Sequence, residues 1–346
     1  MKSNIRSLKM IPLLKTLAIP FITWLVCELI DRAAAGTGVV SNIADVKALL
    51  RTLLTSFSFA LAINCNLTSG RMDLSAGAQM YMGCIFGGNM ALSLGFGGVG
   101  VLILSMLTGA LCGLLVGVLF VHLRILPMVL GLGVSLVFEC LSFGAYSQQG
   151  LKLFAKPGVE ILSNIGFILV VALALVGGVT YLFQYSGFGY KRRAIQGNQK
   201  LAADSGINIY TNCILCYVLA GALVACAGVF DTAYTGGLTP VMGMTSNTQV
   251  FKNMFPMALG LLIGSYCQRP VVGILLGSLS VKILTMCLSK LAMDSSMQNI
   301  IIYSLFLLLN VYRMNAYRFD YAREKRARIH LAQNTRRERT VLQESA

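Results

Sequence analysis

The polar side chains that could do chemistry in this sequence gather between residues 64 and 77. The segment reads Asn-Cys-Asn-Leu-Thr-Ser-Gly-Arg-Met-Asp-Leu-Ser-Ala-Gly and lies between two strongly apolar stretches. Amide, hydroxyl and carboxylate groups are costly in apolar surroundings, so their presence favours contact with a polar solute. An isolated carboxylate in a third apolar stretch is a further candidate of this kind. The candidate substrate-pathway residues are Asn64, Asn66, Asp73, Ser75 and Glu139.

Each candidate also has an ordinary structural alternative. Asp73 or Ser75 could cap the helix that follows, where an acidic group suits the positive end of the helix dipole. Asn64 and Asn66 could bond only to neighbouring helices, and Glu139 could pair with an unidentified buried donor. The sequence leaves these alternatives open.

Enzymatic chemistry is not indicated by the remaining residues. The chain has only two histidines, His122 and His330, and its Cys213-x-x-Cys216 pair lies on an expected helix without a metal or redox context. No Gly-x-x-x-x-Gly-Lys-Ser/Thr phosphate loop occurs in the sequence. We therefore expect no enzyme, no cofactor and no metal site, and any nucleotide energy would come from another chain.

The composition indicates a membrane protein that crosses the bilayer many times. Hydrophobic residues make up 56% of the chain and charged residues 12%, and the mean hydropathy is +0.73. Apolar windows of about 20 residues, enough for one membrane helix, recur along the sequence. The expected fold is all-α, a polytopic bundle of about ten transmembrane helices. The expected spans lie at approximately 11–30, 47–66, 74–94, 98–121, 125–147, 161–184, 211–231, 248–267, 270–290 and 295–313.

Basic residues in the short loops predict the orientation, because such residues stay on the cytoplasmic side during insertion. With these spans, the basic residues before span one and in the loops after spans four, six and eight fall on one side, and Lys152 and Lys156 are the clearest exceptions. Both termini are therefore expected in the cytoplasm. The expected division is a transmembrane domain at 1–313, with a cytoplasmic loop at about 185–210, and a basic cytoplasmic tail at 314–346.

The net charge of +15 could suggest a nucleic-acid partner. However, the positive charge is spread over the loops and the tail, where topology and anionic lipid headgroups explain it. We therefore expect membrane lipids as partners and no nucleic acid. Glycines at four-residue spacing, such as Gly109, Gly113 and Gly117, predict close packing of the helices.

Residues 187–208 form the only substantial polar loop between apolar spans, and they read Gly-Phe-Gly-Tyr-Lys-Arg-Arg-Ala-Ile-Gln-Gly-Asn-Gln-Lys-Leu-Ala-Ala-Asp-Ser-Gly-Ile-Asn. This run is similar to the Gly-x-x-x-x-Ala-x-Gly-Gly-Asn-x-x-Ala-Ala-x-x-Ser-Gly-Ile-x run of the ribose/xylose-type sugar ABC permeases. The segment 64–77 resembles the Asn…Gly-x-Ile-Asp-Leu-Ser-x-Gly signature of the same family, and 217–229 follows its Tyr-x-Leu-x-Gly-x-x-Ala-x-x-Ala-Gly pattern. The resemblance extends over most of the chain.

The sequence also departs from that family. Gln196 stands where the family usually has Gly, and Glu139 and Tyr234 stand where we would align family arginines. The family's Gly-rich stretch after Pro240 is replaced by Phe-Pro-Met-Ala-Leu-Gly at 255–260. The chain thus resembles a divergent member of that family, and the resemblance does not identify its solute.

The resemblance implies the permease subunit of a binding-protein-dependent importer in the bacterial cytoplasmic (inner) membrane. Its implied partners are a cytosolic ABC ATPase, an extracytoplasmic solute-binding protein and a second permease copy or sister permease. It also implies a short coupling helix that docks in the ATPase, with Ala202 and Ala203 packing closely, Gly206 ending the turn, and Lys191, Arg192 and Arg193 as flanking lipid or partner contacts. The implied coupling residues are Lys200, Leu201, Ala202, Ala203, Asp204, Ser205, Gly206, Ile207 and Asn208.

Two other functions remain as alternatives. An ion-coupled secondary transporter of a small polar solute would use intramembrane carboxylates, for which Glu28, Glu139 and Asp231 qualify. A polytopic membrane enzyme would need clustered His, Asp or Glu, and the two histidines do not provide such a cluster.

Overall fold

The computed structural model describes residues 2–34, 36, 38–154 and 156–344. It contains two compact units, Met1–Gln298 and Asn299–Ala346, which are described separately. The first unit is a bundle of helices with one very short strand pair, and the second consists of the greater part of a single long helix. The expected helical membrane bundle is confirmed. The end of the predicted basic tail, residues 345–346, lies outside the described residues.

The elements follow the apolar stretches of the sequence closely. Their bounds, in chain order, are α1 (Lys2–Ala34), α2 (Ile43–Leu67), α3 (Ala76–Met82), η1 (Gly83–Gly87), α4 (Gly88–Ser93), α5 (Gly98–Leu123), α6 (Pro127–Gly144), η2 (Ala145–Gln148), β1 (Leu151–Lys152), η3 (Glu160–Ser163), α7 (Ile165–Gln184), α8 (Gly187–Gly197), α9 (Gln199–Asp204), α10 (Ile209–Thr235), β2 (Gly237–Leu238), α11 (Asn247–Cys267), α12 (Pro270–Lys290) and α13 (Ser295–Glu344).

Eight helices in the described part of the chain are long and apolar enough to cross a membrane. They are α2, α5, α6 with η2, α7, α10, α11, α12 and the first part of α13. The two other expected spans are also helical, because α1 covers residues 11–30, and α3, η1 and α4 together cover most of 74–94. The total of ten spans stays a prediction.

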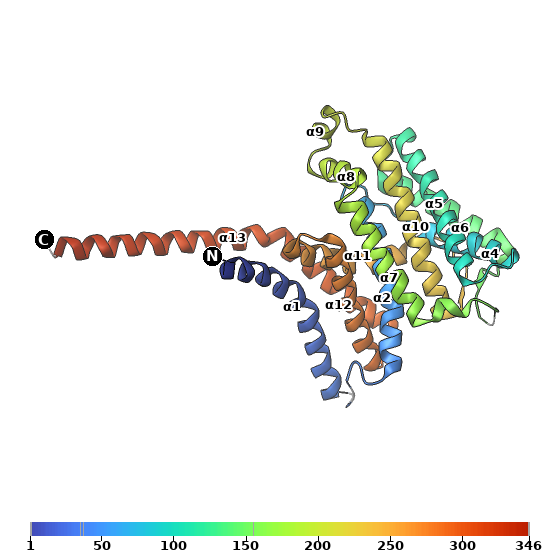
Figure 1. The fold of residues 1–346 in the computed structure, drawn as a ribbon, viewed down its shortest axis with the longest axis horizontal. Coiled ribbons are helices and arrows are strands. Elements are labelled where there is room, and N and C mark those ends of the chain that lie inside the picture. Colours follow the sequence, from blue (N-terminus) through green and yellow to red (C-terminus); the bar gives the residue numbers. More distant parts are fainter. Residues whose placement is uncertain (1, 35, 37, 155, 345–346) are drawn as a thin grey trace. The chain divides into compact units, whose positions relative to one another are not determined.

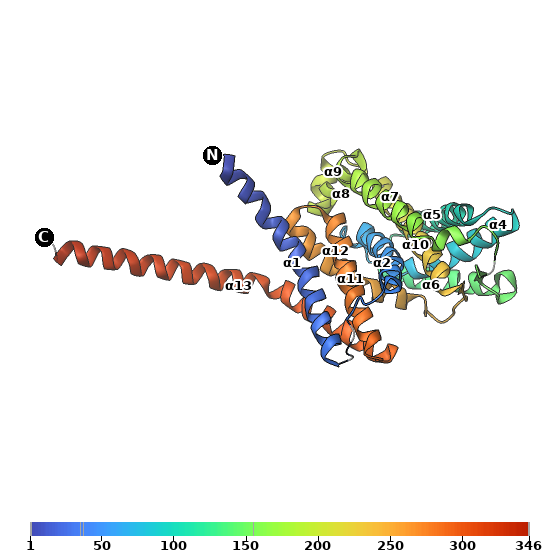
Figure 2. The same ribbon diagram turned by 60° about the horizontal axis from the view of Figure 1, so that its bottom comes forward.

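The centre of the first unit is α10, which packs against α5 on one side and α2 on another (Figure 1 and Figure 2). The helix is apolar around its whole circumference, as expected for a helix that neighbours surround. A second tight pair, α11 and α12, packs against α2. Consequently, α2 is the helix that joins the two halves of the core.

The predicted close packing at glycines is confirmed. A β-carbon placed on Gly109 of α5 would lie 2.4 Å from the carbonyl oxygen of Gly221 in α10, and one on Gly221 would lie 2.1 Å from the carbonyl oxygen of Gly109. The α11–α12 pair has the same kind of contact, since a β-carbon on Gly273 would lie 2.3 Å from the carbonyl oxygen of Gly260. Any side chain at these positions would force the helix backbones apart.

The third apolar stretch is interrupted by a π-helical turn, η1, between α3 and α4. A π turn disturbs the regular helical hydrogen bonds, and a side chain from a neighbouring helix often supplies a replacement. Here the Thr108 hydroxyl of α5 donates a hydrogen bond of 2.8 Å to the carbonyl oxygen of Gly83. The interruption is therefore compensated by a cross-helix bond.

We predict that Gly109→Ala destabilises the protein, because its new methyl group has no room against the α10 backbone. The expected loss in the free energy of unfolding is about 1–3 kcal/mol, measured by denaturant titration in mixed micelles. Gly133→Ala in α6 is the matched control, since nothing lies within 4 Å of a β-carbon there. Equal stability of the two variants would contradict the backbone contact.

Candidate functional site

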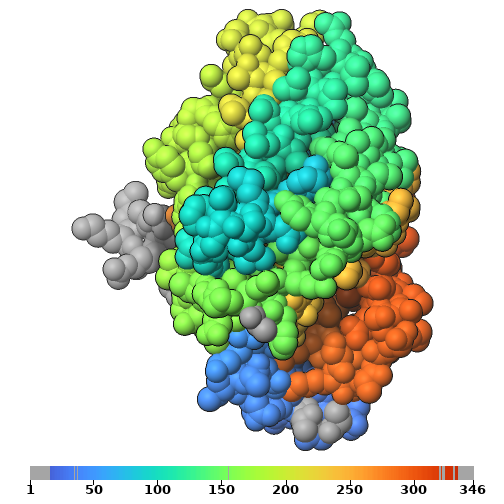
Figure 3. Space-filling model, turned by 90° about the vertical axis from the view of Figure 1, so that its right-hand side faces the viewer, coloured from blue at the N-terminus to red at the C-terminus, as the bar shows by residue number. Residues whose placement is uncertain are grey.

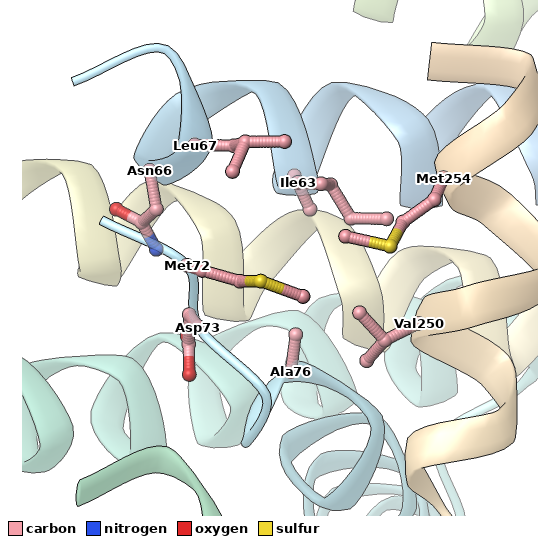
Figure 4. Close-up of a pocket in the computed structure, with 9 residues that line it drawn as sticks. Ile63, Asn66, Leu67, Met72, Asp73, Ala76, Val250 and Met254 are labelled. Atoms are coloured by element: carbon pink, nitrogen blue, oxygen red, sulfur yellow. The ribbon is translucent and has the colours of Figure 1, made fainter. Parts of the chain in front are cut away.

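A narrow pocket lies where the end of α2, the segment 68–75, the start of α3 and the first turns of α11 meet (Figure 4). Its polar groups are the Asn66 amide and the Asp73 carboxylate, and the other lining side chains are apolar. The lining residues are Ala62, Ile63, Asn66, Leu67, Met72, Asp73, Ala76, Val250 and Met254. Of the five predicted pathway residues, the structure thus brings Asn66 and Asp73 to one pocket, while Asn64, Ser75 and Glu139 do not line it.

Asp73 caps the start of α3, as the structural alternative proposed. Its Oδ1 atom accepts the backbone N–H of Ser75 at 2.9 Å, and its Oδ2 atom accepts the side-chain amide of Gln79 at 3.1 Å. The Ser75 hydroxyl donates to Asp73 and accepts from Gln79, and it does not cap the helix itself. The carboxylate therefore orders the chain around the pocket.

The two asparagines of α2 differ in their surroundings. The Asn64 side chain is buried, and neither its oxygen nor its nitrogen has a partner among the described residues. The Asn66 side chain is also buried, and its Oδ1 atom has no partner there either. Asn66, unlike Asn64, is also one of the residues that line the pocket.

Glu139 has a buried carboxylate whose partners are backbone groups. Its Oε2 atom accepts the N–H of Met244 at 2.7 Å, and its Oε1 atom accepts the N–H of Ser246 at 2.9 Å. Both donors lie just before α11, where a negative charge also suits the positive end of the helix dipole. Glu139 thus fixes the beginning of α11. The sequence left open which buried donor would pair with Glu139, and the structure identifies the backbone N–H groups of Met244 and Ser246.

The predicted coupling segment forms two short helices between α7 and α10. A side chain caps the start of each helix by accepting backbone N–H groups. Ser186 accepts the N–H of Gly189 in α8, and Asn198 accepts those of Lys200 and Leu201 in α9. Asn208 accepts the N–H of Thr211 in α10. The predicted helix over 200–208 begins one residue earlier and ends at Asp204. It ends there because Gly206 takes a left-handed conformation with φ of +79°, so that Gly206 and Ile207 can bond back to Ala203 and Ala202.

The exposed face of α9 differs from the prediction at one residue. Ala202 is buried within the chain, with 3% of its surface exposed, whereas the neighbouring Leu201 side chain is 64% exposed. Ala203, Asp204, Ser205 and Gly206 are also exposed. The surface that α9 offers to another protein therefore consists of Leu201 and the residues after Ala202.

Comparison with known proteins assigns the chain to a family. The family described as "Branched-chain amino acid transport system / permease component" matches residues 46–310. The chain belongs to this family. It is a multi-pass protein of the bacterial inner membrane, and as a permease component it is not itself an enzyme.

Individual relatives are more distant. The permease is 29% identical to the galactose/methyl galactoside import permease of Salmonella typhimurium over 39% of this chain and 44% of that protein. It is 24% identical to the fructose import permease of Rhizobium meliloti over 66% of each chain. The chain therefore spans less than half the length of the first of these relatives.

One solved structure shares the fold of the permease. It is an inward-facing conformation of a protein assigned to the metal-chelate type of ABC transporters, with a TM-score of 0.52 and 18% sequence identity. The similarity covers 86% of this chain and 97% of that one. At this identity the comparison shows the fold alone.

Arg192 of the permease is an internal residue, not the surface contact predicted for Lys191, Arg192 and Arg193. It is 4% exposed, its Nη2 atom donates to the carbonyl oxygen of Asn64 at 2.7 Å and to the Thr68 hydroxyl, and its guanidinium lies 4.2 Å from the Phe183 ring centroid. Burial lowers the pKa of this guanidinium, because desolvation disfavours its charged form.

Gln196 adds a third hydrogen bond between α8 and the end of α2, because its side-chain amide donates to the Thr68 hydroxyl at 2.8 Å. The carbonyl groups at the end of a helix lack partners within the helix, and a cation suits the negative end of its dipole. Arg192 and Gln196 thus tie the coupling segment to the end of α2 that carries Asn66. The only sequence signal for the buried face is the three-residue spacing of Gly189, Arg192 and Ile195.

We predict that Arg192→Gln loosens α8 from α2. Backbone amides of 187–200 should exchange with deuterium about tenfold faster in hydrogen-exchange mass spectrometry, because a charged hydrogen bond contributes about 1.5–3 kcal/mol. The control is Arg193→Gln, which removes an exposed charge one residue away. Equal exchange in both variants would contradict the anchoring role of Arg192.

A further prediction concerns Glu139→Gln, which leaves a single oxygen for two backbone donors. One buried N–H then loses its partner, at a cost of about 1–3 kcal/mol in the free energy of unfolding. Deuterium exchange should rise at residues 239–248 in particular. Glu160→Gln, an exposed carboxylate, serves as the control, and an unchanged exchange rate at 239–248 in Glu139→Gln would refute the assignment.

Proposed function

We propose that the chain is the transmembrane subunit of a binding-protein-dependent ABC importer for a sugar or sugar-like solute. The family match, the import permeases among its relatives and the fold of an ABC transporter support this function. The observation that supports this function most directly is the hydrogen bond from Arg192 to the end of α2. This bond joins an exposed polar segment to a pocket inside the bundle.

In this proposal a cytosolic ATPase moves the permease through α8 and α9. The contact surface consists of Lys200, Leu201, Ala203, Asp204, Ser205 and Gly206, with Ala202, Ile207 and Asn208 holding the turn in place. A displacement of α8 pulls on Asn64 and Thr68, and therefore shifts Asn66 at the pocket. Transport is then a shift between two populated states, biased by nucleotide on the partner.

For the pathway, Asn66 is the proposed solute contact, and Asp73, Ser75, Asn64 and Glu139 hold the segments around it. The proposed topology has ten spans with both termini in the cytoplasm, which places α8 and α9 on the ATPase side. The opposite end of the bundle, part of which is visible in Figure 3, has a groove lined in part by Tyr146, Lys152 and Lys156. An extracytoplasmic binding protein would dock at that end, and a second permease copy would complete the pathway.

The ion-coupled alternative has less support. Glu139, which would be the first candidate for a proton or sodium site, already accepts two backbone hydrogen bonds. A carboxylate held in this way is a structural cap, so the importer remains the better account of the geometry.

We expect Leu201→Asp to abolish association with the ATPase, because it places a charge in the centre of the proposed contact. The measurement is purification of the tagged permease from its native membrane, with ATP hydrolysis in the eluate as the readout. A loss of at least about tenfold is expected, which corresponds to roughly 1.4 kcal/mol of binding.

Phe154→Asp is the matched control, since Phe154 is 83% exposed and lies between β1 and α7, in the connection at the other end of the bundle. This variant should retain the ATPase. Equal recovery of hydrolysis from both variants would refute the coupling surface, and no hydrolysis from the wild type with or without nucleotide would refute the ABC importer itself.

A further inference from the structure

Part of the connection between α6 and α7 lies against three other helices. We call its residues 150–154 and 156–163 the strap. The carbonyl oxygen of Gly158 accepts the first N–H group of α5 at 2.9 Å, and the Ser163 hydroxyl donates to the carbonyl oxygen of Ala233 in α10 at 3.4 Å. Arg51 of α2 donates to the carbonyl oxygen of Ser163 at 2.7 Å. The strap is therefore firmly anchored at its α7 end.

The other end of the strap is β1, whose pairing is very short. β1 pairs antiparallel with β2, and Lys152 lies opposite Gly237. The N–H groups of Leu153 and Phe154 both donate to the carbonyl oxygen of Gly236 at 3.1 Å. A strand pair of this size is not stable in water by itself. The pairing therefore depends on contacts with the bundle.

Those contacts come from α4. The Leu151 side chain is 0% exposed, and it fills the space that Gly88 leaves, because a β-carbon on Gly88 would lie 2.6 Å from the Cδ2 atom of Leu151. The side-chain amide of Asn89 donates to the carbonyl oxygen of Gly150 at 2.9 Å. β1 is thus held between α4 and β2 by one apolar side chain and a few hydrogen bonds.

Open space lies on both sides of β1. One groove, of about 550 Å³, is lined by α4 and by residues that include Tyr146, Lys152 and Lys156, and a smaller hollow lies between the strap and the end of α10. The backbone just before β1 is strained, because Tyr146, Ser147 and Gln148 have left-handed φ angles of 48°, 54° and 64°. Such strain is common in segments that switch between conformations.

β2 is connected to the pocket by a short piece of chain. Residues 239–246 lead from β2 to α11, and Glu139 accepts two N–H groups of this connection. The carbonyl group of Ser246 packs on α3, since a β-carbon on Gly77 would lie 2.1 Å from its oxygen. Val250, which lines the pocket, follows in the first turn of α11. A displacement of β2 can therefore reach the pocket through this connection.

We propose that β1 and β2 form a clasp that closes the outer entrance for the solute, and that the two strands separate when the entrance opens. The pocket and the clasp lie at opposite ends of one interrupted span, since α3 begins at the pocket and α4 contacts β1. The gating role rests on the proposed importer function and topology. The contacts that hold the clasp together do not depend on them.

The test measures how often β1 lifts, through a thiol at position 151. Leu151→Cys is made in the full chain, with the accessible Cys140 and Cys267 replaced by Ser. Right-side-out vesicles of the native membrane are treated with a membrane-impermeant sulfonated maleimide. Phe154→Cys in the same background is the reference, since Phe154 is 83% exposed. The thiol at position 151 should react at least about tenfold more slowly, because it reacts only when β1 opens.

Asn89→Ala should raise the rate at position 151 about fivefold and leave the rate at position 154 unchanged, since one neutral hydrogen bond contributes a factor of this order. Ser93→Ala is the matched control, because Ser93 lines the same groove and its hydroxyl bonds the carbonyl oxygen of Met90 within α4. This control should change neither rate. Equal effects of the two variants, or equal rates at positions 151 and 154 before either change, would overturn the clasp.

A second variant strengthens the clasp, so its result does not depend on weakening the fold. Lys152 and Gly237 form a non-hydrogen-bonded pair, in which Cα atoms are about 4.5 Å apart, and this separation permits a disulfide. Oxidation of Lys152→Cys, Gly237→Cys with copper phenanthroline should slow deuterium exchange at residues 239–246, and reduction should reverse the change. Unchanged exchange would refute the connection from the clasp to the pocket.

A third arm addresses gating. ATP and vanadate enclosed in the vesicles should raise the labelling rate at position 151, and Leu201→Asp should abolish this rise without changing the effect of Asn89→Ala. No response to vanadate, in a permease that co-purifies with ATP hydrolysis, would overturn the gating role. If no hydrolysis co-purifies, the importer function fails by itself, and the Asn89→Ala comparison still decides whether the clasp exists.

Discussion

The structure depends on one constraint, which is that backbone hydrogen-bonding groups within a bilayer must find partners inside the protein. Long helices satisfy it along most of the chain, and the informative places are those where a helix is interrupted. At η1 the Thr108 hydroxyl bonds the Gly83 carbonyl, and at the start of α3 the Asp73 carboxylate bonds the Ser75 N–H. Before α11, Glu139 bonds two N–H groups. The polar residues of the spans are thus explained first by the backbone beside them.

This constraint also separates what the sequence could predict from what it could not. The helical class follows from apolar length, and the capping role of Asp73 follows from its place before a helix. The partners of Glu139 have no sequence signature, because they are backbone groups that become neighbours only through folding. Likewise, Arg192 is buried and Arg193 is exposed because of the rotation of α8, which three consecutive basic residues do not reveal.

The geometry of residues 187–208 suits the coupling role that we propose for them. The segment is held at three helix caps and by Arg192, so its exposed face is presented by a fixed scaffold. A binding surface built on ordered backbone loses little conformational freedom when a partner docks. Arg192 connects the segment to the end of α2, and the pocket lies beside that end. The pocket is lined mainly by apolar residues with two polar groups, which is a common composition for a small-molecule site.

The hydrogen bond of Gln196 has a consequence for the design of chimeric permeases. The Gln196 side-chain amide donates to the Thr68 hydroxyl. A hydroxyl at position 68 and an amide at position 196 therefore belong together, although 128 residues separate them in the chain. A chimera that receives only the α8–α9 segment from a relative inherits half of this pair. The α8–α9 segment and the end of α2 therefore have to be transplanted together for this hydrogen bond to form.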